Sequence, residues 1–376
     1  MKIKFRHFTK PQLLKRIRRD LLGRFLAQFT DLALPPPSLP DAEYFDSLAR
    51  LLLAPESLPE RLTEALFAIE EMSTVRAQAQ LEASPEWAEL QPLLAPDSSP
   101  PEIALQIWLV APALLARVHN AQRLRRLTTF EYFGSRSESS SSSSSFSSSA
   151  LNALSDSLDR WFARNHRGHR TTRVELYPLD GEFWFLVRHG DVFTRTPKVE
   201  AQKTEILHFR PERDDVIVYS PEHEEIRINA RTKGERELYR EQFGLHLHGS
   251  ADYFSRRETY TLEPLRADGP QALRAAELSG LTQIILREIE IAFDNGNHEV
   301  ITTAADDLFD RSLQPRQPDP IPRDGRLARA LFEVQFTGGV APRAVEVRPP
   351  NILKLGRGCD AQLVQRWLSS RGFRIG

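Results

Sequence analysis

Hydrophobic and polar residues alternate along a stretch near the middle of the chain. Residues 173–177 have the two-residue period of a strand with one buried face. Residues 183–187 (FWFLV) are apolar on both faces, so we expect a central strand that is covered on both sides. We expect its neighbours to be the short strands that follow at residues 205–209, 216–219 and 226–229. The polar turns between these strands predict an antiparallel meander.

A helix is expected to follow this sheet. Thr232 and Glu235 have the spacing of a capping box, in which each side chain bonds the other residue's amide. Apolar residues then recur at helical spacing. Gly244 is placed to end the helix.

Helical periodicity dominates the first third of the chain. Residues 11–30 form an apolar stripe whose opposite face is basic. Several of the later segments carry proline in the first turn, where its missing amide costs little. The further helices are expected at about residues 41–53, 59–72, 85–94 and 100–128. We therefore predict an all-helical N-terminal domain.

Two biased segments divide the rest of the chain. Residues 135–149 are almost all serine and resemble a flexible linker, because they have too little apolar surface to offset ordering entropy. A second, proline-rich linker is expected at residues 315–323. The Asp-Asn-Gly-Asn sequence at residues 294–297 predicts a hairpin turn.

These segments predict an α+β protein with three folded parts. The parts are a helical domain at residues 1–134, an α+β domain with an antiparallel sheet at residues 150–314, and a β-hairpin plus helix unit at residues 324–376.

Composition narrows the classes of function. Charged residues make up 27% of the chain, but the formal net charge is only -1, so any affinity for nucleic acid must come from local clusters. Cys359 is the single cysteine, which excludes an internal disulfide and a zinc site with several thiolates. Residues 103–118 are too short and too polar to span a membrane and are expected to form a core helix. With no secretory signal, the expected location is the cytoplasm.

One candidate for chemistry is a set of histidines and carboxylates. In an extended segment, His246 and His248 would project from one face and could share a divalent metal. His189 and Asp191 have the same spacing, and Asp252 follows nearby. Such a metal could activate water for hydrolysis. The alternative is that these side chains face solvent or bond the backbone, since histidine has many structural uses.

A second candidate resembles the acid, acid and base of a nuclease. Asp215 begins one expected strand, and Glu225 and Arg227 lie on the next. Paired carboxylates beside a cation are suited to hold Mg²⁺. However, arginine cannot lose a proton to act as a base. Charged residues that alternate along an exposed strand explain the pattern equally well.

Two basic segments form the third candidate, because clustered cations suit phosphate or an acidic partner. They could equally be solvated faces or protein contacts, since no known nucleic-acid motif accompanies them. The residues are Lys15, Arg16, Arg18 and Arg19 in the first helix, and Arg164, Arg167 and Arg170 before the first strand of the central sheet.

The sequence has no complete catalytic motif. It contains neither a phosphate-binding glycine-rich loop nor a Gly-x-Ser-x-Gly elbow, and it implies no particular cofactor. We therefore expect a non-catalytic cytoplasmic interaction or accessory protein of a larger assembly, with a protein partner and some contact with nucleic acid through the basic segments. The alternatives are a metal-dependent hydrolase or nuclease that uses the central sheet, and a DNA-binding regulator.

Overall fold

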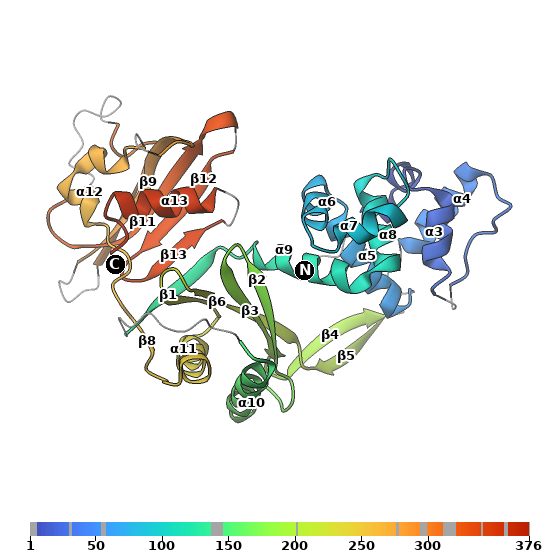
Figure 1. Ribbon diagram of the computed structural model, residues 1–376, viewed down its shortest axis with the longest axis horizontal. Helices are drawn as coiled ribbons and strands as arrows, with labels where there is room; N and C mark the ends of the chain where they lie inside the picture. The colour runs from blue at the N-terminus through green and yellow to red at the C-terminus, as the bar shows by residue number, and fades with distance from the viewer. Residues whose placement is uncertain are drawn as a thin grey trace. The chain divides into compact units, whose positions relative to one another are not determined.

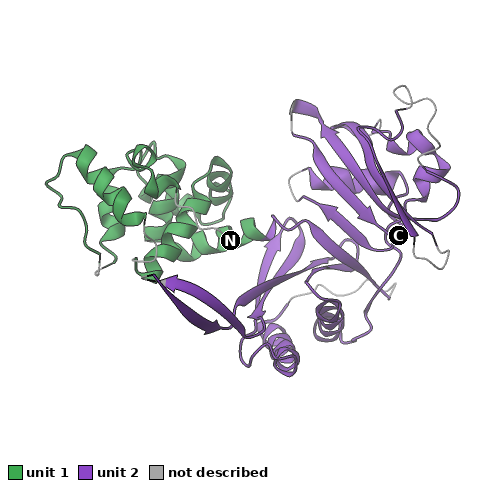
Figure 2. Ribbon diagram, turned by 180° about the vertical axis from the view of Figure 1, so that it is seen from behind, with its two compact units in different colours: residues 1–123 green, residues 124–376 purple. Residues whose placement is uncertain are grey.

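A computed structural model gives the structure of the chain, which forms two compact units, Met1–Arg123 and Leu124–Gly376 (Figure 2). The first unit is helical and the second combines a large sheet with helices, so the predicted α+β class is confirmed. The structure describes residues 6–29, 32–53, 58–136, 146–200, 202–275, 278–293, 299–310, 321–339, 341–356 and 360–375.

The first unit has its own apolar core, which is built from the buried stripes of its helices. The helices are α1 (Arg6–Thr9), α2 (Pro11–Leu14), α3 (Arg19–Leu26), α4 (Asp41–Leu52), α5 (Glu60–Met72), α6 (Val75–Glu82), α7 (Trp87–Leu90), η2 (Gln91–Leu93), α8 (Pro100–Val110) and α9 (Pro112–Leu124).

Two of the long helices expected in this unit are broken. The helix expected at residues 11–30 is divided into α2 and α3, because the Arg18 amide leaves the helical pattern and donates to the Glu102 carboxylate at 3.0 Å. The helix expected at residues 100–128 is divided into α8 and α9 at Pro112, which has no amide to continue α8 and disfavours a helical conformation at Ala111.

The second unit contains a large antiparallel sheet, and the predicted antiparallel pairing is confirmed. Its strand order is β10-β9-β11-β12-β13-β1-β7-β6-β3-β2, and β8 pairs with β1 (Figure 1). The strands are β1 (Thr129–Ser135), β2 (Arg173–Leu179), β3 (Glu182–Gly190), β6 (Glu212–Ser220), β7 (Glu225–Asn229), β8 (Phe254–Ser255), β9 (Leu281–Phe293), β10 (Glu299–Ala304), β11 (Arg326–Phe336), β12 (Arg343–Arg348) and β13 (Ile352–Leu355).

Strand β1 joins the two halves of this sheet. It hydrogen-bonds to β13 on one side and to β7 on the other. From the sequence, residues 129–134 are expected in the helical domain and residues 324–376 are expected to form a separate unit. In the structure both segments contribute strands to the same sheet, and the described residues on both sides of residues 137–145 belong to the second unit.

Both faces of the sheet are covered, as expected for the apolar strand β3. Phe185 and Val187 pack in the core with α10 and α11, whereas Trp184 and Leu186 belong to the core that contains Trp367 of α13. The helices of this unit are α10 (Ser148–Arg164), α11 (Lys233–His248), α12 (Glu263–Ala267), η3 (Gly269–Leu273), η4 (Thr337–Gly339) and α13 (Ala361–Ser370).

Two strands lie outside the large sheet. β4 (Thr194–Glu200) and β5 (Lys203–Phe209) pair with each other and form a separate two-stranded ribbon (Figure 1). The expectation that residues 205–209 lie next to the central strand is therefore wrong. Strand β3 already pairs with β2 and β6, so both of its edges are occupied.

Helix α11 begins as predicted but ends later. The Thr232 amide donates to Glu235 at 2.8 Å and the Glu235 amide donates to the Thr232 hydroxyl at 3.1 Å, which confirms the capping box. The predicted end at Gly244 is wrong, because the helix continues to His248 and ends at Gly249 with a φ of 77°. Gly244 instead allows close packing, since a Cβ there would lie 2.6 Å from the Ser250 carbonyl oxygen.

Some predictions concern residues outside the described part of the chain. These are most of the serine-rich segment (residues 137–145), the hairpin turn at residues 294–297, most of the proline-rich linker (residues 315–320) and Cys359.

Candidate functional site

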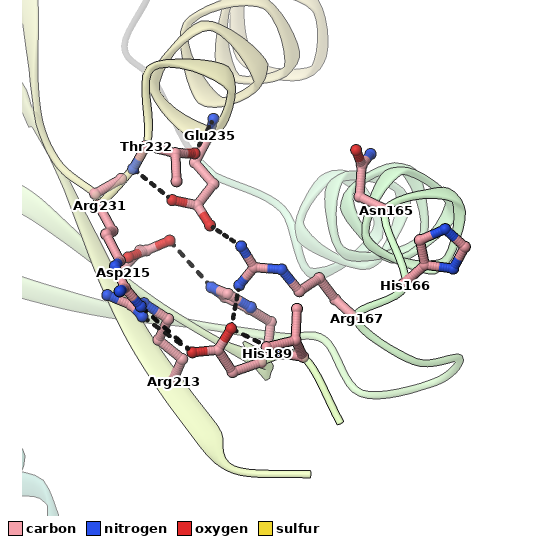
Figure 3. Close-up of polar contacts among 12 residues, drawn as sticks. Asn165, His166, Arg167, His189, Arg213, Asp215, Arg231, Thr232 and Glu235 are labelled. Carbon is pink, nitrogen blue, oxygen red and sulfur yellow. Dashed lines mark hydrogen bonds and ion pairs between the residues drawn. The ribbon is translucent and has the colours of Figure 1, made fainter. Parts of the chain in front are cut away.

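Three ionisable side chains converge beneath the first turn of α11. His189 comes from the end of β3, Asp215 from β6 and Glu235 from α11 (Figure 3). The three residues are 1%, 2% and 0% exposed, respectively. One ligand atom from each lies within 4.8 Å of the others. Among the described residues, this is the group whose geometry could hold a metal ion.

The cluster is already bonded to other groups of the chain. His189 Nε2 lies 3.0 Å from an Asp215 oxygen, and the Tyr239 hydroxyl donates to the same oxygen at 2.8 Å. Burial, followed by the Asp215 charge, raises the pKa of Tyr239 well above its usual value, so the phenol stays protonated. On the other side, Arg167 forms an ion pair with Glu235 at 3.1 Å. A metal ion would have to displace this guanidinium.

The histidine ring itself faces acceptors on both sides. Its Nδ1 lies 2.9 Å from the Gly190 carbonyl oxygen, and its Nε2 faces the Asp215 carboxylate. A metal ligand must present a free lone pair to the ion. Phe162 stacks on the ring at 3.9 Å with an interplanar angle of 11°. These contacts hold the ring in the core and direct both of its nitrogens at groups of the chain itself.

Arginines connect this cluster to the start of the ribbon. Arg167, in the loop after α10, contacts Glu235 with one nitrogen (Figure 3). Another of its nitrogens contacts Asp191 at 2.7 Å. Arg213 contacts the second Asp191 oxygen at 3.1 Å. Burial alone would raise the pKa of Asp191, but the Val192 amide and the two guanidinium charges hold it below its usual value. Asp191 therefore remains ionised, and its negative charge is balanced by the two guanidinium groups.

The end of the ribbon is fixed at the same place. Arg210 follows β5 directly and donates to the carbonyl oxygens of Asp191 and His166. Its guanidinium also lies over the Phe193 ring at 5.9 Å. We call Arg167, Asp191, Arg210, Arg213 and Glu235 the ribbon anchor. Because the anchor holds both ends of the ribbon, it sets the direction in which the ribbon leaves the sheet.

The ribbon itself is exposed to an extent unusual for a pair of strands. Every residue of β5 is exposed, and none of the residues of β4 whose exposure is described is buried. Apolar side chains contribute to this surface, with Phe193 63% and Val199 79% exposed. The remaining exposed apolar residues in this region are Val192, Ile206, Leu207 and Phe209. Exposed apolar side chains gathered on one projecting element are typical of an interaction surface.

The predicted histidine and carboxylate set does not form one site. His246 and His248 lie in α11 and not in an extended segment, so they point about 200° apart around the helix. The His246 ring contacts the Ser157 hydroxyl at 2.9 Å, and the His248 ring stacks on Tyr253 at 3.9 Å. Asp252 is exposed beyond the helix, and Asp191 belongs to the ribbon anchor.

The predicted nuclease set is also separated. Val216 pairs with Asn229 and Ser220 pairs with Glu225, so Asp215 and Glu225 lie at opposite ends of this ladder, about 17 Å apart. Arg227 is fully buried on the opposite face of the sheet from Asp215, where it forms an ion pair with Glu182. Glu225 forms an ion pair with Arg374 at 3.0 Å.

Several of the predicted basic residues stabilise the fold. Arg18 contacts Glu102 at 2.9 Å, and Arg19 contacts Asp41 at 2.6 Å and lies over the Tyr44 ring. Lys15 lies 3.8 Å from Asp46, and Arg167 belongs to the ribbon anchor. Arg16, Arg164 and Arg170 are exposed.

Sequence reasoning did not identify Glu235 or the ribbon as parts of the candidate site. Glu235 was recognised only as a capping residue, and no sequence spacing links it to His189 and Asp215. The ribbon had a signal in Pro197, which suits an edge strand rather than a central one.

Comparisons with known proteins give no family for this chain. No protein-family model matches it, and no curated protein is similar enough to count as a relative. Within the described residues, none of the helices has the length and apolar character needed to cross a bilayer.

Proposed function

We propose that this protein is a non-catalytic cytoplasmic interaction protein that contacts a partner in a larger assembly through the β4–β5 ribbon. The observation that carries the proposal is the exposure of the ribbon on both of its faces, together with its apolar side chains. The single cysteine in the sequence suits a reducing compartment.

The energetics of a two-stranded ribbon support this proposal. An isolated pair of strands is marginally stable in water, because it buries little apolar surface. Here the ribbon anchor holds the two ends, but β4 and β5 pair with no other strand among the described residues. A partner that covers Val199 or Leu207 would bury apolar surface that the described chain leaves exposed.

The buried cluster supports the non-catalytic part of the proposal. His189, Asp215 and Glu235 are nearly inaccessible to solvent and are bonded to Tyr239 and Arg167. A general acid, base or metal must reach its substrate within hydrogen-bond distance. In this arrangement the side chains hold β3, β6 and α11 together.

The ribbon proposal can be tested by site-specific photo-cross-linking in host cells. A photoreactive phenylalanine analogue at Leu207 should give a discrete cross-linked species, identified by mass spectrometry, because this side chain is exposed on the ribbon. The matched control is the same analogue at Val300, which is similarly exposed on strand β10. Equal products from both positions, or none from position 207, would reject the ribbon as the contact element.

The convergence of His189, Asp215 and Glu235 favours a metal-dependent hydrolase as the second candidate. That function requires Arg167 to move away from Glu235 so that the carboxylate can bind a metal ion. Calorimetric titration with Zn²⁺ or Mn²⁺ should then show binding that His189→Ala abolishes and His246→Ala leaves unchanged. If the two variants and the wild type titrate alike, this candidate is rejected.

A further inference from the structure

The two edges of the ribbon can be distinguished by their hydrogen-bonding groups. In an antiparallel pair, residues alternate between positions that bond the partner strand and positions whose amide and carbonyl point outward. Pro197 pairs with Ile206 and has no amide, so an intact ladder requires these two residues at an outward-pointing position. The pair that closes the turn, Glu200 and Lys203, encloses two residues and is therefore a bonded pair, which gives the same alternation.

This alternation leaves one edge open and one edge interrupted. The outer edge of β5 presents the amides and carbonyls of Thr204, Ile206 and His208. The outer edge of β4 has Pro197 at its centre and so lacks the middle donor. Proline at such a position is a common way to block the pairing of an edge strand. In the described part of the chain, β5 pairs only with β4.

We propose that the outer edge of β5 pairs antiparallel with β5 of a second copy of this chain, with Ile206 opposite the partner's Ile206. The inference rests on the proposed function, because it names the partner of the same ribbon. The resulting four-stranded ribbon has a two-fold axis, which is the commonest symmetry of protein dimers. Three bonded pairs along the two facing β5 strands, with the Ile206 pair on the axis, give about six hydrogen bonds.

The charges of β5 are compatible with this register and oppose one of its two neighbours. With Ile206 on the axis, Glu205 lies opposite the partner's Leu207 and Lys203 lies opposite the partner's Phe209, so no like charges meet. In the neighbouring register, Glu205 would instead lie on the two-fold axis, opposite the partner's Glu205. Two like charges directly opposite each other are unfavourable. Glu205 is already neutralised by Lys198 at 3.0 Å within its own ribbon.

The same register brings apolar side chains together. Pro197 and Ile206 lie side by side on one face of the ribbon, because they are paired. In the dimer this pair meets the partner's pair and makes a continuous apolar row across the four strands. Ile206, which is 39% exposed in the single chain, becomes the centre of that row. Cross-strand pairs of this kind stabilise sheets.

Sedimentation equilibrium of the purified full chain tests the proposal. The wild type should show a monomer–dimer equilibrium, and Ile206→Pro should weaken the dimer by about 10- to 100-fold, because it removes one central amide from each copy. This amide points away from β4, so the substitution breaks no bond within the ribbon. Ile206→Val keeps the amide and is the matched control, with dimerisation close to that of the wild type. A wild type that stays monomeric at all concentrations, or an unchanged dimer in Ile206→Pro, would overturn the proposal.

Disulfide trapping tests the register independently of the proline variant. Directly opposed residues in a bonded pair have Cα atoms about 5.5 Å apart, which a disulfide can span. Ile206→Cys should therefore form a linked dimer under mild oxidation faster than Val199→Cys, an exposed position on β4. The native Cys359 is present in both variants and gives the background rate. Equal rates for the two variants would contradict the register.

The outcomes also separate this inference from the proposed function. A monomeric chain whose position 207 still cross-links to a different protein would overturn the homotypic pairing and leave the ribbon as the contact element. A chain that forms no dimer and gives no cross-link from position 207 would overturn both.

Discussion

At the scale of single residues, one carboxylate holds the loop that carries Arg167. Asp159, on α10, accepts hydrogen bonds from the amides of Arg170, Thr171 and Thr172 at 2.8, 2.9 and 3.2 Å. Burial alone would raise the pKa of Asp159, but these hydrogen bonds hold it below its usual value. The ionised carboxylate therefore stabilises the folded loop at neutral pH.

Replacing Asp159 by alanine should destabilise the protein by about 1 to 3 kcal/mol, because several amides lose a charged acceptor. Since the folded pKa is lowered, the contribution is present above the pKa of the unfolded chain and is lost on acidification. Urea denaturation at pH 7 measures the change. Asp156→Ala, an exposed position on the same helix, is the control and should cost little. Equal losses in the two variants would show that the loop contacts contribute nothing.

The surroundings of His248 lead us to expect a second effect of pH on the stability of the fold. Burial lowers its pKa and the nearby Glu224 offsets only part of that shift, while the ring stacks on Tyr253. The unfolded chain therefore binds a proton more readily than the folded chain as pH falls below about 6.5, and stability decreases. His248→Phe keeps an aromatic ring and should lose less stability than the wild type between pH 7.5 and 5.5 in urea denaturation. His223→Phe, at an exposed position, should keep the wild-type dependence.

Residue identities alone could not have assembled the buried cluster. His189 and Asp215 were recognised as candidates, but in separate sets with different expected partners. Their contact depends on the register of β3 with β6, which pairs His189 with Arg213 and so places Asp215 diagonally opposite. Glu235 enters only through the packing of α11 on the sheet. Such long-range contacts leave no spacing in the sequence.

At the scale of elements, the ribbon depends on close packing at its start. A methyl group at Gly190 would collide with the Arg167 carbonyl oxygen and with the Arg210 side chain. Both residues belong to the ribbon anchor. The glycine therefore allows the end of β3, the loop after α10 and the end of the ribbon to meet.

Gly190→Ala should destabilise the second unit by about 1 to 3 kcal/mol, because the backbone at Arg167 must shift. Hydrogen exchange should become faster at residues 191–213 than elsewhere in the sheet. Gly23→Ala is the control, since nothing lies within 4 Å of a Cβ there and the helical position favours alanine. Unchanged exchange at residues 191–213 would show that the anchor does not hold the ribbon.

Local patterns predicted several elements but failed where tertiary contacts decided the outcome. The capping box and the strands at residues 183–187, 216–219 and 226–229 follow directly from local sequence. Gly244 looked like a helix end, but close packing against Ser250 explains its presence within α11. Consequently the two histidines after it were assigned to the wrong kind of segment.

At the scale of the whole molecule, the α+β class and the antiparallel sheet could be predicted, whereas the division of the chain could not. A serine-rich or proline-rich segment marks a change in composition, but it does not decide which strands pair. Strand β1, before residues 137–145, pairs with β7, which lies between the two segments, and with β13, which follows the proline-rich one. Each of the two units is nevertheless built around buried apolar clusters of its own.

The open edge of β5 is recognised only when the sequence and the strand pairing are combined. Pro197 is visible in the sequence, but its meaning depends on the ladder that pairs it with Ile206. Only then do the outward-pointing groups of Thr204, Ile206 and His208 define an open edge. The proposed pairing with a second copy requires that this edge is used.

Residue-resolved hydrogen exchange at several protein concentrations tests that claim most directly. The amides of Glu205 and Leu207 bond β4 within one chain, so their protection should not depend on concentration. The amides of Thr204, Ile206 and His208 should exchange rapidly in dilute protein and become protected as the concentration rises. If these three amides exchange at the same rapid rate at every concentration, the β5 edge does not pair with a second copy and the central claim is contradicted.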